Sequence, residues 1–423
     1  MEHLLHYVWK YKLYAPSCLV TTRGLPVSVI DPGIQNTNAG PDFFNAKIKI
    51  GDTMWAGNIE IHSKASDWLL HGHHKDKAYD SVVLHLAGTV DADVYRTDGA
   101  AIAQARLTIP PAVSKNIDWL IYRDIPVPCL YSIKHIEPVH ISLWINALLC
   151  ERLERKTKDI LLLMEQYNDD WNEVFYIILT RCFGFGINND AFERLARSLP
   201  LHAVYRQRSS CRQLEAMLFG QAGLLEEAGA CPYYRLLQQE YKFLQHKYGL
   251  KPLEGAVFKS LRVRPINFPH IKIAQLAALW HRRDTLFSAI LHTDDMQQIK
   301  ELFRIPASAY WDTHYHFRHA SPAREKAPGE AALTIILINA VAPMLFAYGR
   351  KNKQDAYCRR ALRLLETIPP EKNQTVAMYC LSGIQVHNAG DSQALIQLKK
   401  EYCDRKECLR CRIGFRLLKQ ASL

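Results

Sequence analysis

The sequence contains no apolar run long enough to suggest a membrane span. Such a span needs about 18 apolar residues in a row, and the best candidate, residues 331–346, is interrupted by Asn339 and Pro343. Residues 1–12 also lack the apolar core of a secretory signal, because charged residues and histidines occur throughout them. We therefore expect a cytoplasmic protein that has no membrane partner.

In the absence of a secretory signal, the 11 cysteines do not indicate a disulfide framework. They are predicted to be reduced thiols or metal ligands. No internal repeat is evident, although an array of degenerate helical pairs stays an open interpretation. The hydrophobic content of 48% and the charged content of 22% are those of an ordinary soluble globular protein.

Basic residues are in excess, with 53 lysines and arginines against 42 acidic residues, which leaves a formal net charge of +11. A positive surface attracts polyanions and speeds their encounter, but it says nothing about fold or chemistry. We expect nucleic acid, DNA in particular, as the partner.

The 423 residues predict two domains of different composition. A helix pattern covers residues 2–14, and strand-like runs follow at residues 23–31, 42–62 and 81–86. Residues 94–107, with a turn at the Asp-Gly pair 98–99, predict a second hairpin that closes the sheet. From residue 137 onward the apolar residues recur at helical spacing instead. The sequence therefore predicts an α/β domain with a mixed sheet over residues 1–130. A large all-α domain follows over residues 131–423, and it offers a surface for a protein partner.

The central feature of the predicted sheet is a β-hairpin that turns at the Gly-Asp pair 51–52. Asp42 stands at the outer end of the first strand, and Glu60 and His62 share one face at the outer end of the second. A two-residue loop would pair Asp42 with Ile61 and direct its carboxylate to the other face. A three-residue loop with a bulge would pair Asp42 with His62. We predict this second register, because it brings the three side chains together.

Two carboxylates at such a short separation repel each other, and a hard divalent cation bound between them usually offsets this repulsion. We therefore predict Asp42 and Glu60 as ligands for Mg²⁺ or Mn²⁺. The alternative is a solvated strand end on which an acid and a histidine are ordinary neighbours.

The strings Pro41-Asp42 and Glu60-Ile61-His62 resemble the core motif of the PD-(D/E)XK nuclease superfamily, in which an acid opens one strand and an acid and a base follow on the next. The resemblance implies a restriction-endonuclease-like sheet and a metal-dependent nuclease, a hydrolase. It departs at His62, where that superfamily usually has lysine, and His62 would orient or deprotonate the attacking water. Glu2 on the first helix would be a further catalytic acid, or else a first-turn glutamate that interacts with the helix dipole.

The histidine at position 62 also admits other interpretations. A histidine ligand would favour Mn²⁺ or Zn²⁺ over Mg²⁺. The rival to a nuclease is a catalytically inactive scaffold that binds nucleic acid or protein through a nuclease-like core and a helical domain. An active site needs Asp42 and Glu60 within one ion's reach in an open groove, whereas a scaffold would have them apart or sealed by apolar side chains.

More of the chain is similar to the bacterial proteins grouped as the domain of unknown function 2851 family. The strings that carry this resemblance are spread over nearly the whole sequence: Gly40-Pro41-Asp42-Phe43, Glu60-Ile61-His62, Asp67-Trp68, Leu84-His85, Phe219-Gly220-Gln221-Ala222-Gly223, and Tyr402-Cys403 to Cys411. This family implies no particular activity.

Two further residues are candidates for support of the site. His85 interrupts the apolar run 81–86, which predicts a buried strand, so it is either a hydrogen-bonded core residue or an orienting partner of His62. Asp67 follows closely after the second strand of the hairpin. The histidines at 71, 73 and 74 have no standard zinc spacing, and the glycine at 72 argues against one regular helix. We expect a polar, partly solvated segment there that touches substrate phosphate.

The C-terminal cysteines Cys403, Cys408 and Cys411 have the spacing C-x4-C-x2-C. The last pair is spaced as in a zinc knuckle or an iron–sulfur corner. We predict a structural zinc ion or iron–sulfur cluster that fixes the C-terminus. The candidates for a fourth ligand are Cys380, His387 and Cys18. The alternative is that the three cysteines pack as small hydrophobic side chains.

Overall fold

The structure is a computed structural model that describes residues 2–15, 19–36, 38–122, 125–226, 231–318 and 320–419. The chain forms two compact units. The sheet unit comprises Met1–Trp144, Met378–Ile384 and Leu398–Leu423, and the helical unit comprises Ile145–Ala377 and Gln385–Gln397. This division differs from the predicted domains 1–130 and 131–423, because the last segments of the chain group with the sheet.

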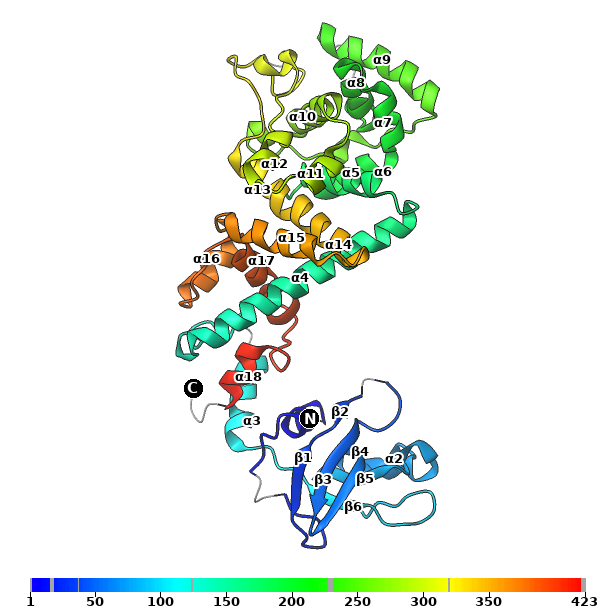
Figure 1. Cartoon of the computed structure of the whole chain (residues 1–423), viewed down its shortest axis with the longest axis vertical. Helices are drawn as coiled ribbons and strands as arrows, with labels where there is room; N and C mark the ends of the chain where they lie inside the picture. The colour runs from blue at the N-terminus through cyan, green and yellow to red at the C-terminus, as the bar shows by residue number, and fades with distance from the viewer. Residues whose placement is uncertain are drawn as a thin grey trace. The chain divides into compact units, whose positions relative to one another are not determined.

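The sheet unit is built on one mixed sheet, whose strands lie in the order β1, β3, β4, β5, β6, with β2 paired to β3 (Figure 1). The β1–β3 and β3–β4 pairs are antiparallel, and β4, β5 and β6 run parallel. The strands are β1 Val27–Asp31, β2 Ile34–Gln35, β3 Phe43–Ile50, β4 Thr53–Lys64, β5 Val82–Thr89 and β6 Ala103–Arg106. The predicted fold class, an α/β sheet followed by a large helical region, is confirmed.

The strand β5 lies inside the sheet, between β4 and β6, and its first six residues are buried. It is the buried strand that the apolar run 81–86 predicts, since such a run suits a strand that is covered on both faces. Trp68, Val82, Val94 and Ile102 form a small core cluster around it.

The β3–β4 hairpin closes with a two-residue loop, so the predicted three-residue loop is wrong. Ile50 pairs with Thr53 across this loop. Gly51 makes the tight turn because it adopts a left-handed backbone conformation, with φ of 57°.

A bulge does occur in this hairpin, but at the far end of β3. Asn45 has a positive φ of 56°, which asparagine tolerates better than most residues, and the strand register shifts there. Beyond the bulge Phe43 pairs with Ile59. Asp42 therefore stands opposite Glu60, and the predicted pairing of Asp42 with the histidine two residues further on is wrong.

The predicted second hairpin, residues 94–107, contributes only one strand to the sheet. β6 pairs with β5 in parallel, whereas Tyr95 meets Ala101 in an isolated antiparallel bridge outside the named strands. The turn at residues 98–99 forms as predicted, with Gly99 at a φ of 81°. The expectation that both arms close the sheet is wrong, because the chain re-enters the sheet alongside β5.

Among the described residues, four α-helices lie entirely within the sheet unit: α1 Glu2–Lys10, α2 Asp67–Leu70, α3 Pro111–Ile117 and α18 Arg412–Lys419. The helix α1 packs against β4 and buries Leu5, His6, Val8 and Trp9. It is shorter than the predicted helix 2–14. Its packing places a histidine against the outer end of the hairpin.

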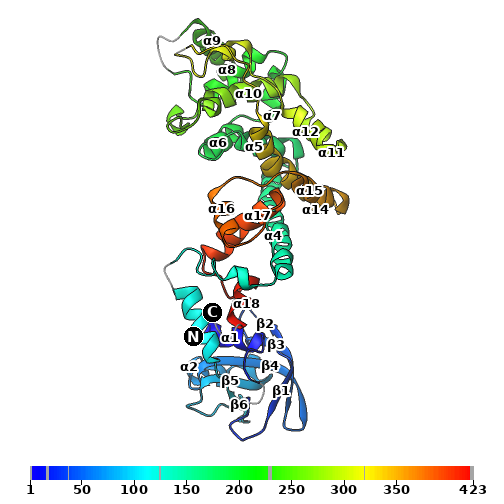
Figure 2. The ribbon, with the colours of Figure 1, turned by 90° about the vertical axis from the view of Figure 1, so that its left-hand side faces the viewer.

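The helical unit contains helices of 7 to 17 residues. They are α5 Trp171–Cys182, α6 Asn189–Ser198, α7 Leu201–Gln207, α8 Cys211–Gln221, α9 Pro232–Tyr248, α10 Pro269–Arg282, α11 Leu286–His292, α12 Met296–Phe303, α13 Glu330–Ile336, α14 Ala342–Lys351, α15 Asp355–Thr367 and α17 Ala389–Gln397. Two more, α4 Pro138–Gln166 and α16 Gln374–Leu381, contribute residues to both units. Extended backbone at Arg283 separates α10 from α11. The helices α14 and α15 lie side by side in both views (Figures 1 and 2).

One helix of the described residues, Glu330–Lys351, is long and apolar enough to cross a membrane, by length and composition alone. The residues expected to interrupt it do not. Pro343 occupies the first turn of α14, and the Asn339 amide donates to the carbonyl of Ile335 in its own helix (3.2 Å). Within its apolar window 67% is buried in the structure. Core helices of soluble proteins meet the same criterion, so the feature is weak evidence for a membrane.

Candidate functional site

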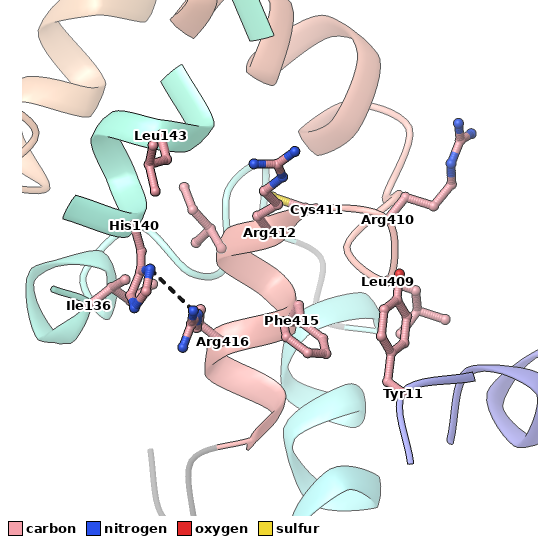
Figure 3. Close-up of a pocket in the computed structure, with 11 residues that line it drawn as sticks. Tyr11, Ile136, His140, Leu143, Leu409, Arg410, Cys411, Arg412, Phe415 and Arg416 are labelled. Atoms are coloured by element: carbon pink, nitrogen blue, oxygen red, sulfur yellow. Dashed lines mark hydrogen bonds between the residues drawn. The ribbon is translucent and has the colours of Figure 1, made fainter. Parts of the chain in front are cut away.

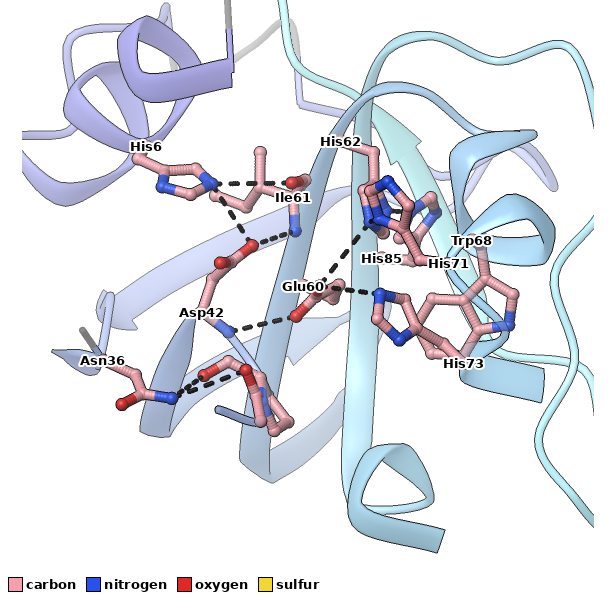
Figure 4. A network of polar contacts seen from close by, with 12 residues as sticks. His6, Asn36, Asp42, Glu60, Ile61, His62, Trp68, His71, His73 and His85 are labelled. Atoms are coloured by element: carbon pink, nitrogen blue, oxygen red, sulfur yellow. Dashed lines mark hydrogen bonds and ion pairs between the residues drawn. The ribbon is translucent and has the colours of Figure 1, made fainter. Parts of the chain in front are cut away.

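Asp42 and Glu60 meet across β3 and β4, and each carboxylate is placed by the backbone of the opposite strand (Figure 4). The Asp42 amide donates to Glu60 Oε2 (3.0 Å), and the Ile61 amide donates to Asp42 Oδ2 (2.9 Å). This reciprocal arrangement follows from the bulge, which sets the two residues opposite each other. The structure therefore brings the two predicted carboxylates together.

The loop before Asp42 is held by Asn36, a residue that the sequence did not single out. Its backbone amide donates to the carbonyl of Asp42 (2.8 Å), and its side-chain amide donates to the carbonyl of Pro41 (3.1 Å) and to three carbonyls before it (Figure 4). An asparagine that satisfies the carbonyls of a tight loop fixes its path. Asn36 therefore positions Asp42 at the strand end.

The two carboxylates differ in exposure. The Glu60 side chain is only 6% exposed, whereas that of Asp42 is 21% exposed. Burial, and then the charge of Asp42, raise the pKa of Glu60 to about 9. Without a cation nearby, Glu60 is consequently protonated at neutral pH, and Asp42 is the acid that faces solvent.

His6 of α1 completes the Asp42 side of the site. Its Nε2 lies 3.2 Å from Asp42 Oδ2 and 3.5 Å from the carbonyl of Ile61. Burial lowers the pKa of His6, but the hydrogen bond to Asp42 and the charge of Asp42 outweigh it, so the pKa lies above its ordinary value. The predicted acid Glu2 stands one helical turn earlier, and its charge also raises the pKa of both His6 and Glu60.

Three histidines gather on the Glu60 side. His73 Nε2 lies 3.4 Å and His62 Nε2 lies 3.6 Å from Glu60 Oε1. His71 Nδ1 is 3.2 Å from His62 Nε2 (Figure 4). One ring nitrogen from each of the three lies within 4.8 Å of the others, and no other such group of potential metal ligands occurs among the described residues. We call His62, His71 and His73 the histidine cluster.

The local fold explains how residues 71 and 73 reach β4. His71 ends the short helix α2, and Gly72 then takes a left-handed conformation with φ of 75° before a 3₁₀ turn begins at His73. This reversal lets two histidines that are close in sequence face the same strand. His73 is buried and His71 is exposed. The cluster is therefore buried at His73 and open to solvent at His71.

His85 and Gln104 lie behind the histidine cluster. His85 is fully buried and its Nε2 is 2.9 Å from His62 Nδ1, an arrangement that fits both sequence interpretations, a hydrogen-bonded core residue and an orienting partner of His62. Burial, followed by the neighbouring histidines, lowers the pKa of His62 and of His85 to about 3. Burial also lowers the pKa of His73. These three rings are therefore neutral in the absence of a cation.

We infer the proton positions on these rings from their hydrogen-bond partners. The Gln104 amide donates through Nε2 to the carbonyl of Ala92 (3.0 Å) and faces His85 Nδ1 (3.4 Å), which therefore accepts. His85 then carries its proton on Nε2 and donates to His62 Nδ1. His62 in turn carries its proton on Nε2, which faces Glu60 and His71.

Aromatic rings form the walls of the cluster. Trp68 is fully buried and meets His62, His73 and His85 edge to face. The ring of Tyr79 stacks on His73 at 3.8 Å between centroids. These contacts limit rotation of the imidazoles and so preorganise them.

Asp67, a candidate for support of the site, binds the backbone next to the site. Its carboxylate accepts a hydrogen bond from the backbone amide of Lys64 (3.0 Å) and so fixes the turn between β4 and α2. It supports the segment that carries His71 and His73, rather than a reacting group.

The C-terminal cysteines lie in the sheet unit but away from ideal ligand spacing. Cys403 Sγ is 3.1 Å from the hydroxyl of Tyr379, and Cys408 Sγ is 3.6 Å from the carbonyl of Leu120. Of the proposed fourth ligands, Cys380 is exposed, His387 belongs to the helical unit, and Cys18 lies outside the described residues.

Comparison with known proteins identifies one family. A family model described as "Protein of unknown function (DUF2851)" matches residues 2–374. The match includes the whole sheet, the Asp42–Glu60 pair and the histidine cluster, and it ends before the C-terminal cysteines. A search of curated proteins finds no match, and a search of solved structures finds none either.

Proposed function

This chain belongs to the DUF2851 family of proteins of unknown function, and we propose that it is a metal-dependent hydrolase that cleaves phosphodiester bonds in nucleic acid. The observation that carries the proposal is the convergence of three imidazoles, two of which lie beside the carboxyl of Glu60, with Asp42 next to it. Carboxylates and imidazoles in one cluster, with strongly shifted pKa values, are typical of catalytic sites.

The donor set fits a divalent transition-metal ion. His62, His71, His73 and Glu60 would hold it, and their neutral imidazoles suit Mn²⁺ or Zn²⁺ better than Mg²⁺. Binding through His62 Nε2 requires that nitrogen to give up its proton. A neutral His62 then carries its proton on Nδ1, so the proton of His85 must move from Nε2 to Nδ1 as well. When bound, such an ion polarises a phosphoryl oxygen and lowers the pKa of a coordinated water.

The roles of ligand and of general acid fall to different residues of the site. His62 has one nitrogen engaged by His85 and the other facing Glu60 and His71, so it serves as a ligand rather than as the general base that the superfamily resemblance implies. Asp42 keeps a proton on His6 Nε2 by raising the pKa of that imidazole. His6 is therefore the group suited to donate a proton to the leaving oxygen.

The partner follows from charge. A formal net charge of +11 favours encounter with a polyanion, and a phosphodiester is a substrate class whose charge a bound divalent cation would neutralise. DNA stays the favoured nucleic acid.

A second candidate function rests on burial. The side chains of His62 and Glu60 are only 2% and 6% exposed, which leaves a substrate little access except at His71 and Asp42. In this alternative the cluster is a structural metal site or polar core. The protein would then be a scaffold that binds nucleic acid or protein without cleaving it.

The test is cleavage of single- and double-stranded DNA and RNA by the purified full chain with Mn²⁺, Zn²⁺ or Mg²⁺. We expect cleavage by the wild type that is abolished in Glu60→Gln and His73→Ala. Glu165→Gln and His246→Ala, both at exposed positions, are the matched controls and should cleave normally. Binding of the nucleic acids without cleavage under any metal would refute the hydrolase and favour the scaffold.

A further inference from the structure

A pocket in the sheet unit lies between α18, the start of α4 and the residue that follows α1 (Figure 3). Its volume is about 370 Å³, within the range of about 300–1,000 Å³ that is usual for pockets that bind small ligands. We call it the arginine pocket. The lining residues that determine its chemistry are Tyr11, His140, Leu143, Arg412, Phe415 and Arg416.

The segment that forms most of the arginine pocket is basic. Residues 408–419 contain no acidic residue, and their basic residues are Arg410, Arg412, Arg416 and Lys419. Among the described residues, neither Arg412 nor Arg416 pairs with a carboxylate, and both are exposed. They are four residues apart on α18, so their side chains share one face of the helix, where like charges repel each other. An anion bound between them would offset this repulsion.

Neighbouring side chains hold both guanidinium groups in place. The Arg412 Cζ atom lies over the ring of Trp144, 5.0 Å from its centroid, in a cation–π contact. Arg416 donates to His140 Nδ1 (3.1 Å), and Figure 3 shows it extended from α18 toward α4. This bond engages one nitrogen of a guanidinium, whose planar fork of donors matches two oxygens of a phosphate. The two arginines therefore form a site suited to phosphate.

Aromatic rings lie on the other side of α18. Figure 3 shows Phe415 directed away from Arg416 and toward Tyr11, and the two ring centroids are 4.8 Å apart. The side chain of Lys419 adds a positive charge, because its Nζ lies 4.3 Å from the Phe415 centroid. Tyr11 is 36% exposed, so its ring can be reached from solvent. Exposed aromatic rings beside arginines are typical of surfaces that bind unpaired nucleotides.

We propose that the arginine pocket binds single-stranded nucleic acid, with Arg412 and Arg416 on a phosphate and a base stacked on Tyr11. Contacts to phosphate carry no sequence information, and stacking accepts any base. A duplex binds less well, because its bases are stacked on each other and cannot reach the ring. The volume of the pocket suits one nucleotide of the strand.

The proposal rests on nucleic acid as the partner in the proposed function, and it adds how a strand is held. The helix α1 connects the pocket with the candidate metal site, since His6 faces Asp42 and Tyr11 comes directly after the helix. These two residues of the α1 segment are five positions apart, which is about 7.5 Å along a helix. The pocket therefore keeps a bound strand close to the residues proposed to cleave it.

Binding of a fluorescent oligothymidylate is measured by anisotropy, in chelator and on the full chain with Glu60→Gln, so that no strand is cut. Arg412→Gln/Arg416→Gln should lower the slope of log affinity against log salt by about 1.4, since each phosphate contact on a single strand contributes about 0.7. Arg359→Gln/Arg363→Gln, an exposed pair with the same spacing on α15, is the matched control and should keep the parent slope. An unchanged slope in the pocket variant, or equal affinity for a duplex of the same length, would overturn the proposal.

Tyr11→Leu tests base stacking. It should weaken binding at least about fivefold while the salt slope stays that of the parent, and a strand without bases should bind both proteins equally. Photo-cross-linking of an iodouracil-containing strand to the otherwise unaltered chain needs no pocket variant, and attachment to Tyr11 is expected. Cross-links confined to other peptides would overturn the proposal.

The pocket and the hydrolase fail separately in these experiments. Binding that depends on Arg412 and Arg416, without cleavage by the wild type under any metal, would refute the hydrolase and support the pocket. Cleavage by the wild type, with binding unchanged in the arginine variant, would refute the pocket alone. Absence of any binding by the parent would overturn the pocket whatever the cleavage assay shows.

Discussion

Glu60 is the residue at which the two halves of the site meet. Its Oε2 accepts from the Asp42 amide, and its Oε1 faces His62 and His73. Burial raises its pKa to about 9, so a proton and a metal ion compete for the same carboxyl group. Metal affinity at this site is therefore expected to rise with pH.

His85 gives the first prediction at the scale of single residues. It is fully buried and contacts the histidine cluster through His62 Nδ1. Residues that orient a metal-binding histidine typically contribute about 10–100-fold to metal affinity. His85→Ala should weaken Mn²⁺ or Zn²⁺ binding by that factor in isothermal titration, while His135→Ala, at an exposed position, should bind as the wild type does. Equal affinity in both variants would contradict the orienting role.

The buried carboxyl group of Glu215, in the helical unit, gives the second prediction. Burial raises its pKa, although it accepts hydrogen bonds from Ser308 (2.6 Å), Tyr233 and Trp311 (3.2 Å), which lower it. The folded protein therefore holds this proton at a pH where the unfolded chain, with a pKa of about 4.3, has lost it. The contribution to stability is complete below the unfolded pKa and is lost as pH rises through the folded pKa.

We expect Glu215→Gln to remove this pH dependence, since the amide cannot ionise. The measurement is the urea midpoint of unfolding between about pH 4 and pH 8. Glu254→Gln, at an exposed glutamate, should retain the wild-type slope. A wild-type slope in Glu215→Gln as well would show that this carboxyl does not set it.

At the scale of elements, the turn between α2 and the 3₁₀ segment decides whether the histidines converge. Gly72 has a φ of 75°, and a Cβ there would meet nothing within 4 Å. Gly72→Ala should therefore cost only the backbone penalty of about 1–2 kcal/mol and should weaken metal binding. Gly329→Ala, where the space is equally open but φ is −80°, should be close to neutral. Thermal unfolding and metal titration of both variants provide the check.

The hairpin shows how much of the site could be predicted from the sequence. The Gly-Asp turn and the alternation of the strands predict the elements and the closeness of Asp42 and Glu60. The register could not be predicted, because the positive φ of Asn45 is a conformation that asparagine tolerates, not one it signals. The bulge there decides which residues stand opposite each other.

The other missed residues depended on contacts between elements. His6 lies four residues after Glu2 on the same helix, which was a usable signal, but only packing on β4 sets it beside Asp42. His71 and His73 match no zinc motif, because the three donors come from different local structures. His62 lies on a strand, His71 at the end of a helix and His73 after a glycine turn.

At the scale of the whole molecule, the sheet unit depends on the end of the chain. Leu417 is fully buried, and its carbonyl accepts from the Asn116 amide of α3 (3.1 Å). Leu417→Ala should destabilise the sheet unit by about 2–5 kcal/mol. Hydrogen exchange should then rise in β4 and β5 as well as in α18, with Lys419→Ala as the exposed control. Faster exchange confined to α18 would show that the helix is not part of the sheet unit's cooperative core.

The discontinuous make-up of the sheet unit has a consequence for biosynthesis. The six strands of the described residues are translated before the helical unit, yet Leu398–Leu423, which belong to the same unit as the sheet, are translated after it. Most of the helical unit is translated in between and can fold while the nascent sheet is still incomplete. The sheet unit is thus the first of the two to begin and the last to be completed, so we expect its strands to need chaperone protection until Leu398–Leu423 have been synthesised, and metal to bind after that.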